Sequence, residues 1–194
     1  MSTPTADLVV GAPAPDFTLT DTNNNPWQLS SKLGKTVVLL FYPGDNTPVC
    51  TTQMCALRDR WADYQATNAE IVGISTDSVE KHRQFIQQHR LPLRLLADPT
   101  GEVNKLYNAR SWRPGRAARA VVVIDKDGII RHRKVEPLAI FRPKDDQILD
   151  AIKKAGGGGR GSGNNNLVEI STRHLTPDPR PPPKENRYGK QHRL

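Results

Sequence analysis

Short apolar runs alternate with amphipathic stretches along the first 155 residues of the chain. Residues 36–42 (TVVLLFY) and 70–75 (EIVGIS) are continuous apolar runs rich in β-branched side chains, typical of strands buried on both faces of a sheet. Between them, residues 51–68 carry apolar side chains at spacings of three and four, the stripe of an amphipathic helix. This stripe consists of Met54, Leu57, Trp61 and Tyr64. The pattern predicts a strand, a helix and a second strand in succession.

A second helix is predicted over residues 78–89, because apolar positions again follow the helical period and Pro92 stands just beyond them. Its inward face would carry Val79, His82, Phe85 and Ile86. Residues 120–125 and 129–133 flank the turn sequence DKDG, which indicates a β-hairpin. A closing helix is expected from about residue 143 to residue 154.

A smaller hairpin is predicted near the start of the chain. Residues 17–19 and 27–29 are short strand-like segments, and the turn-rich sequence DTNNNP joins them. Added to the later elements, this hairpin completes an α/β pattern. We therefore expect a mixed β-sheet with helices on both faces and an N-terminal hairpin extension.

The composition changes near Ala155. Residues 156–194 contain seven Gly, five Pro and few large apolar side chains, so this segment cannot bury enough surface to offset its ordering entropy. We expect one domain over residues 1–155 and a disordered tail over residues 156–194. The tail holds seven Lys/Arg and three Asp/Glu, half of the net charge of +8, so the predicted domain is only mildly basic.

Cysteine usage points to chemistry in a reducing compartment. The start of the chain has no signal-peptide pattern, and no stretch approaches the roughly 20 apolar residues that span a bilayer. We therefore expect a cytoplasmic protein without membrane contact. In that setting, two cysteines five positions apart are more often catalytic or metal-binding than structural.

Cys50 stands where the strand ending at Tyr42 meets the following helix, in the sequence PGDNTPVCTTQMC. The carboxyl ends of such strands form ligand-binding crevices. In the first turn of a helix, unpaired N–H groups and the positive end of the helix dipole favour a thiolate. The position alone predicts an activated sulfur at Cys50.

The spacing Pro43, Thr47, Cys50 resembles the signature of the peroxiredoxins. The longer string YPGDNTPVCTTQMC is similar to the peroxiredoxin Q or bacterioferritin comigratory protein subfamily, as are LGKTVVLLFYP, ISTDS, ADPTGEV and VVVIDKDG. The likeness extends from about Val10 to Lys154. It departs from the subfamily pattern at Val49, commonly Gly, and at Gln53, commonly Glu.

The resemblance implies a thioredoxin-like fold and a thiol peroxidase that reduces hydrogen peroxide and organic hydroperoxides with electrons from thioredoxin or a similar dithiol, without a cofactor or a metal. It assigns Cys50 as the peroxidatic cysteine, Cys55 as the resolving cysteine and Thr47 as the hydroxyl that contacts sulfur and peroxide. Pro43 would shield the pocket. The conserved arginine corresponds to Arg119, with Arg116 and Arg113 as nearby competitors. A monomer or weak dimer is expected.

The two cysteines cannot form this disulfide on an intact helix. Five residues of ideal helix separate the Cα atoms by about 8.5 Å, beyond the ~7 Å limit for a disulfide. The helix must therefore unwind locally when Cys55 captures oxidised Cys50.

Three other hypotheses remain open at this point. A metal site would need ligands beyond the two thiolates, and His82, His89 and His132 form no matching motif. A thioredoxin-like module could instead dock a partner through its basic tail, although the diffuse charge argues against specific nucleic-acid binding. A disulfide exchanger without peroxidase activity would ordinarily have a two-residue cysteine spacing, which this chain lacks.

Overall fold

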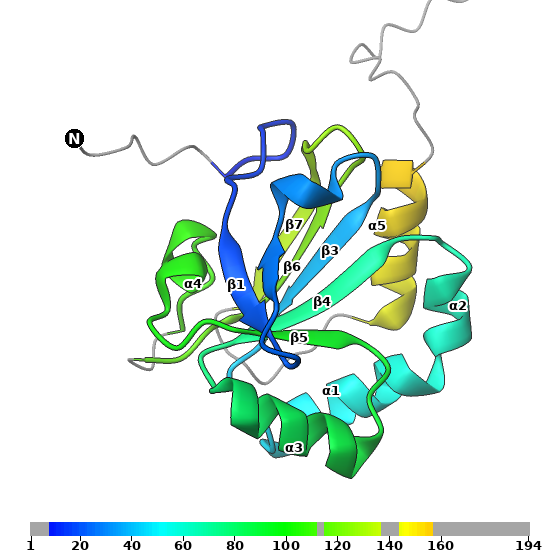
Figure 1. Cartoon of the computed structure of the whole chain (residues 1–194). Coiled ribbons are helices and arrows are strands. Elements are labelled where there is room, and N and C mark those ends of the chain that lie inside the picture. Colours follow the sequence, from blue (N-terminus) through cyan, green and yellow to red (C-terminus); the bar gives the residue numbers. More distant parts are fainter. Residues whose placement is uncertain (1–7, 112–114, 137–143, 157–194) are drawn as a thin grey trace, which may run out of the picture. The chain divides into compact units, whose positions relative to one another are not determined.

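The strands of the computed structural model, which describes residues 8–111, 115–136 and 144–156, form a seven-stranded mixed sheet (Figure 1). The order across the sheet is β2-β1-β5-β4-β3-β6-β7. The strands are β1 (Thr18–Asp21), β2 (Pro26–Gln28), β3 (Val37–Phe41), β4 (Glu70–Ser75), β5 (Arg94–Ala97), β6 (Arg119–Ile124) and β7 (Ile130–Glu136). The predicted central strands are confirmed, since β3 and β4 pair in parallel at the middle of the sheet.

Helices accompany the sheet between and after these strands. They are the 3-10 turn η1 (Ser30–Lys32) and the helices α1 (Pro48–Asp59), α2 (Trp61–Gln65), α3 (Val79–His89), α4 (Glu102–Leu106) and α5 (Asp145–Gly156). In Figure 1, α4 lies on one side of the sheet, whereas α1, α2 and α5 lie toward the other. The expectation of helices on both faces is therefore confirmed.

Side chains of β3 alternate between two hydrophobic clusters, as expected of a strand buried on both faces. Val38 and Leu40 belong to a cluster with apolar residues of α1, α2, α3 and α5, whereas Val37, Leu39 and Phe41 belong to a second cluster with α4 and the N-terminal hairpin. Every residue of β3 is buried. The sheet thus separates two hydrophobic cores. Helix α1 begins at Pro48, a few residues after β3 ends at Phe41.

The N-terminal hairpin extends the sheet rather than standing apart from it. β1 pairs antiparallel with both β2 and β5. Asp21 closes the turn by accepting hydrogen bonds from the backbone N–H groups of Asn23 and Asn25 through its side chain. The turn predicted from DTNNNP is confirmed, with the strands displaced by about one residue.

The helix predicted over residues 51–68 was wrong in its extent. α1 begins earlier, at Pro48, and ends at Asp59, and α2 follows after a break at Arg60, whose φ and ψ are −107° and 19°. No Gly or Pro marks this break. The Arg60 side chain bonds to Asp63 and Asp146, so interactions with α2 and α5 accompany it.

Three short elements, η1, β5 and α4, were not predicted. With three, four and five residues, they are too short to display a hydrophobic period. The other helices follow the predicted pattern: α3 begins after Ser78, which accepts a hydrogen bond from the Lys81 N–H at 3.4 Å. In α3, His82 and Phe85 are buried as expected.

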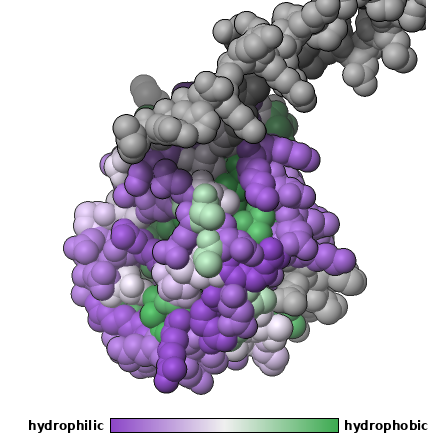
Figure 2. Space-filling model, turned by 90° about the vertical axis from the view of Figure 1, so that its right-hand side faces the viewer, coloured by the Kyte–Doolittle hydropathy of each residue, from purple (hydrophilic) through white to green (hydrophobic). Residues whose placement is uncertain are grey.

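The face on which α2 and α5 lie is mostly hydrophilic, with apolar side chains in small separate spots (Figure 2). The apolar stripe of α5 points inward, since Ile148, Leu149 and Ile152 are buried. Among the described residues, no helix is long and apolar enough to cross a membrane. Residues 157–194, which make up nearly all of the predicted tail, lie outside the described residues. The same is true of Arg113.

Candidate active site

A buried polar network fixes the loop between β3 and α1. The two carboxylate oxygens of Asp45 bind different partners: one accepts from the Tyr42 hydroxyl at 2.7 Å, and the other lies 2.7 Å from Nδ1 of His82. The backbone N–H of Asp45 donates to the Asp77 carboxylate at 2.7 Å. Asp45 and His82 are almost fully buried, so these bonds fix the loop that leads into α1.

Tyr42 acts in this network as a neutral hydroxyl donor. Burial, reinforced by the negative charge of Asp45, raises the pKa of Tyr42 well above its ordinary value. Gly44 is the other constrained position of the loop: its φ is +157°, and a Cβ there would meet an Asp77 carboxylate oxygen at 2.8 Å. A side chain at Gly44 would therefore push apart the loop and its support.

Cys50 lies in the first turn of α1, where the sequence predicts it. Thr47 is the N-cap residue and Pro48 the first helical residue, an arrangement that suits proline because its missing N–H would have no helical partner. Cys50 is 1% exposed and belongs to the hydrophobic cluster that contains Val38 and Leu40 of β3. A thiolate there loses water, so it needs nearby positive charge.

Arg119 supplies that charge. It is the first residue of β6, which pairs antiparallel with β3 so that Ala120 lies opposite Phe41. This register brings the buried guanidinium beneath the start of α1, with Nη2 3.4 Å from the Cys50 sulfur. Nη1 donates to the side-chain oxygen of Gln53, one turn after Cys50 on the same helix. The contact joins two candidates that are 69 residues apart in the sequence.

Two other arginines were considered for this role, and the structure describes one of them. Arg116 is exposed, and its Nη1 donates to the Pro43 carbonyl at 3.2 Å. Arg113 lies outside the described residues. Arg119 is therefore the arginine that the structure brings to the sulfur.

Pro43 and Thr47 flank the entrance to the helix. The Thr47 hydroxyl donates a long hydrogen bond of 3.4 Å to the Gly44 carbonyl, and its side chain makes no capping bond to α1. Pro43 is half-buried. The Thr47 hydroxyl is thus directed to the loop, and the expected roles of Thr47 and Pro43 at the sulfur stay predictions.

Cys55 faces different surroundings on the same helix. It is half-buried, and its sulfur lies 4.0 Å from Nδ1 of His89, the last residue of α3. Both cysteines are free thiols, and α1 is continuous between them. Among the described residues, no group of three or more His, Cys, Asp or Glu side chains could hold a metal ion.

Sequence reasoning missed the roles of Gln53, Asp45 and His82. Gln53 stands three residues after Cys50, so helical periodicity places both on one face, a usable signal. His82 on an otherwise apolar stripe is a second signal, because a buried polar ring requires a partner. Nothing local identifies Asp45 as that partner, since 37 residues separate the two.

A buried thiol at a helix N-terminus, contacted by a guanidinium, indicates an enzyme that uses a cysteine as its nucleophile. The model of the AhpC/TSA family matches residues 10–133. The chain belongs to this family and is a peroxiredoxin, a thiol peroxidase.

Curated relatives agree with this assignment. A protein named peroxiredoxin Q, chloroplastic, from Sedum lineare is 41% identical over 127 residues, covering 65% of this chain and 68% of the relative. Peroxiredoxin 2 from Thermoplasma acidophilum is 38% identical over 150 residues, covering 74% of each chain. For a peroxiredoxin Q from Triticum aestivum, 41% identical, the match spans only 57% of its length.

Solved structures confirm the predicted thioredoxin-like peroxiredoxin fold. Peroxidoxin BcpB from Mycobacterium tuberculosis matches with a TM-score of 0.66 and 30% identity, covering 75% of this chain and 96% of that one. The reduced 2-Cys peroxiredoxin of Plasmodium vivax matches with a TM-score of 0.67 and 33% identity, covering 74% of this chain and 80% of that one.

Proposed function

We propose that this chain reduces hydrogen peroxide and organic hydroperoxides by a two-cysteine cycle in the cytoplasm. Cys50 is oxidised first, Cys55 then captures it in an intramolecular disulfide, and thioredoxin or a similar dithiol reduces the disulfide. The observation that carries the proposal is the 3.4 Å contact between the Arg119 guanidinium and the Cys50 sulfur at the start of α1.

In the first step, the Cys50 thiolate attacks one peroxide oxygen. The O–O bond breaks, the second oxygen leaves as hydroxide or alkoxide and takes up a proton, and Cys50 becomes a sulfenic acid. Complete ionisation of an ordinary thiol at pH 7 gains only about thirtyfold in thiolate. Fast reduction must therefore come mainly from stabilising negative charge on oxygen in the transition state.

Arg119 suits this role because its planar guanidinium offers several donors in a fixed arrangement. Gln53 restrains one of its nitrogens, which leaves another directed at the reacting sulfur. We assign Thr47 as a second donor: its long bond to the Gly44 carbonyl is weak, so the hydroxyl can turn to a peroxide oxygen. Pro43 would limit the access of water to this loop.

In the second step, Cys55 attacks the oxidised sulfur, a disulfide forms and water leaves. Both cysteines stand on the continuous helix α1, five residues apart, which is too far for a disulfide at ideal helical geometry. The first turn of α1 must open to bring Cys50 to Cys55. The same opening would present the disulfide to its reductant.

The order of the two cysteines is tested with Cys50→Ser and Cys55→Ser, which remove one sulfur each and so serve as controls for each other. Peroxide consumption is followed with and without a thioredoxin system. Cys50→Ser should lose peroxide reduction altogether, whereas Cys55→Ser should consume one equivalent of peroxide per chain and then stall. Sustained thioredoxin-dependent turnover by either variant would overturn the two-cysteine cycle.

A further inference from the structure

The Cys55 sulfur and the His89 ring form a polar pair away from Arg119. Nδ1 of His89 lies 4.0 Å from the sulfur, at the outer limit of hydrogen bonding to sulfur. The other ring nitrogen, Nε2, is buried and has no hydrogen-bond partner among the described residues. Within that part of the chain, the sulfur is therefore the one polar group to which the ring is directed.

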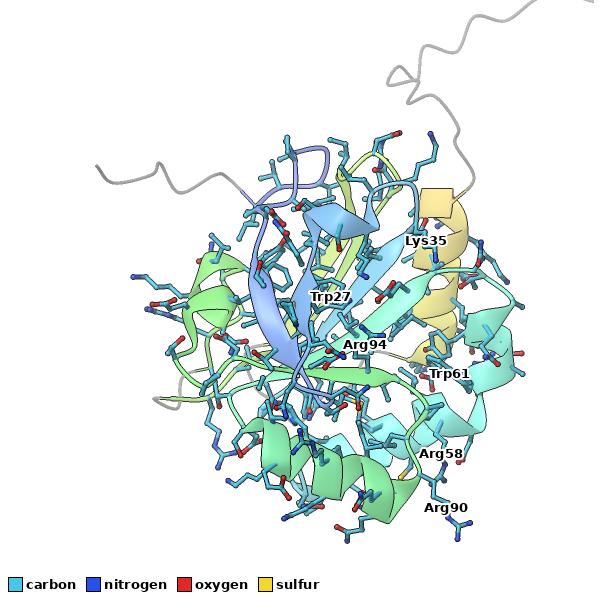
Figure 3. All side chains as sticks on the ribbon, in the orientation of Figure 1. Trp27, Lys35, Arg58, Trp61, Arg90 and Arg94 are labelled. Atoms are coloured by element: carbon cyan, nitrogen blue, oxygen red, sulfur yellow. The ribbon has the colours of Figure 1, made fainter. Side chains whose placement is uncertain are left out.

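Contacts on two sides hold this pair in place. The His89 ring packs edge-on against Phe85, with centroids 5.0 Å apart at an interplanar angle of 67°. Arg58, three residues after Cys55 on α1, donates from Nη1 to the His89 carbonyl at 2.8 Å. The second half of α1 is thereby tied to the end of α3, where Arg58 and Arg90 lie in Figure 3.

A helix end and charged side chains lie beside the pair. His89 is the last residue of α3, where unpaired carbonyls and the negative end of the helix dipole stabilise a cationic ring. The Arg58 guanidinium interacts electrostatically with the Cys55 sulfur, and Asp59 binds the same guanidinium. Arg90, the next residue, is exposed and extends into solvent (Figure 3).

We propose that His89 is the general base of the resolving step, an assignment that rests on the proposed two-cysteine cycle. His89 takes the proton of Cys55 as the thiolate attacks the sulfur of the Cys50 sulfenic acid. The new S–S bond uses the thiolate electron pair, the S–O bond of Cys50 breaks, and the departing hydroxide accepts the proton and leaves as water. The ring returns to its neutral form.

The arrangement keeps base and nucleophile together while the helix opens. Unwinding of the first turn moves Cys50, whereas the bond from Arg58 to the His89 carbonyl holds the second half of α1 against α3. A separation of 4.0 Å in the reduced protein needs only a small shift for proton transfer, since catalytic hydrogen bonds are often long before the reacting complex forms. Cys55 thus stays next to His89 while the opening of the first turn brings Cys50 to it.

The test separates sulfenic acid formation from disulfide formation in His89→Asn. Asparagine places an amide near the position of Nδ1, so it can hydrogen-bond to sulfur but cannot accept its proton at neutral pH. Reduced protein is mixed with one equivalent of peroxide, and both species are followed by rapid quenching with a sulfenic-acid trap and mass spectrometry. His132→Gln, which removes a histidine of β7 far along the chain from both cysteines, is the matched control.

At pH 7, His89→Asn should form the sulfenic acid within about twofold of the wild-type rate and the disulfide about ten- to thirtyfold more slowly, because an ordinary thiol is only about 3% ionised there. The deficit should shrink toward onefold near pH 10, where such a thiol ionises without help. His132→Gln should match the wild type throughout. In His89→Ala, added imidazole should restore part of the lost rate.

Two results would overturn the assignment: disulfide formation by His89→Asn at the wild-type rate at pH 7, or a deficit that stays the same at pH 10 and is not relieved by imidazole in His89→Ala. The second result would indicate that the ring only packs between the helices. If the wild type itself forms no Cys50–Cys55 disulfide, the two-cysteine cycle fails, and the role of His89 fails with it.

Discussion

The two halves of α1 carry one cysteine each, and the halves differ in what surrounds them. In the first half, Cys50 is 1% exposed, contacts Arg119 and follows a loop held by Asp45 and His82. In the second half, Cys55 is half-buried beside His89 at the end of α3. The comparison teaches that two chemically identical thiols on one helix have different surroundings because different elements pack against them. The proposed roles of the two cysteines rest on this difference, so substitutions that perturb one half at a time test it.

The largest effect is expected from Arg119→Met, which removes the guanidinium from the Cys50 half. The second-order rate of peroxide reduction, measured by stopped flow, should fall about 10²–10³-fold, since one donor to a developing oxyanion is typically worth that much. The thiolate fraction, measured by alkylation rates against pH, should change less. Arg116→Met, which removes an exposed arginine bonded to the Pro43 carbonyl, is the control and should stay within about threefold of the wild type.

His82→Leu should weaken the polar network that fixes the loop before Cys50. The substitution leaves the buried Asp45 carboxylate without the partner it has at 2.7 Å, so the free energy of unfolding should fall by roughly 2–3 kcal/mol. Urea denaturation measures this loss. His82→Gln can still donate to Asp45 and should lose less. Equal stabilities for the wild type and His82→Leu would show that the network does not hold the loop.

A smaller effect is expected from Gln53→Leu, which takes away the side chain that restrains Arg119. Peroxide reduction should slow about tenfold, equivalent to about 1.4 kcal/mol in the barrier, because the guanidinium loses its fixed orientation. Gln53→Glu keeps an acceptor oxygen and should remain within about threefold. A Gln53→Leu enzyme as fast as the wild type would mean that Arg119 is positioned by other contacts.

The smallest effect should follow from Arg58→Met, which acts on the Cys55 half alone. Loss of the bond to the His89 carbonyl should raise the amide exchange rates of residues 57–60 modestly and leave the rate of peroxide reduction unchanged. Exchange mass spectrometry and stopped flow give the two readouts. A slower peroxide reaction in this variant would contradict the separation of the two halves.

Much of the fold and part of the site could be predicted from the sequence. The strands β3 and β4 have unbroken apolar runs, and Cys50 stands between the first of these runs and a helical stripe, so both signals are local. Arg119 could be assigned only through resemblance, since its contact with Cys50, 69 residues away, depends on the pairing of β6 with β3. His89 lies 34 residues from Cys55 in the sequence. No local pattern predicts their contact, because it depends on how α1 and α3 pack.

The account is tested most directly by hydrogen exchange along α1 in the reduced protein and in protein oxidised with one equivalent of peroxide. We predict that the amides of residues 51–54 lose their protection when the Cys50–Cys55 disulfide forms, while those of residues 57–60, which remain tied to α3, keep it. Formation of the disulfide with residues 51–54 still protected, or with protection lost equally along the whole helix, would contradict it.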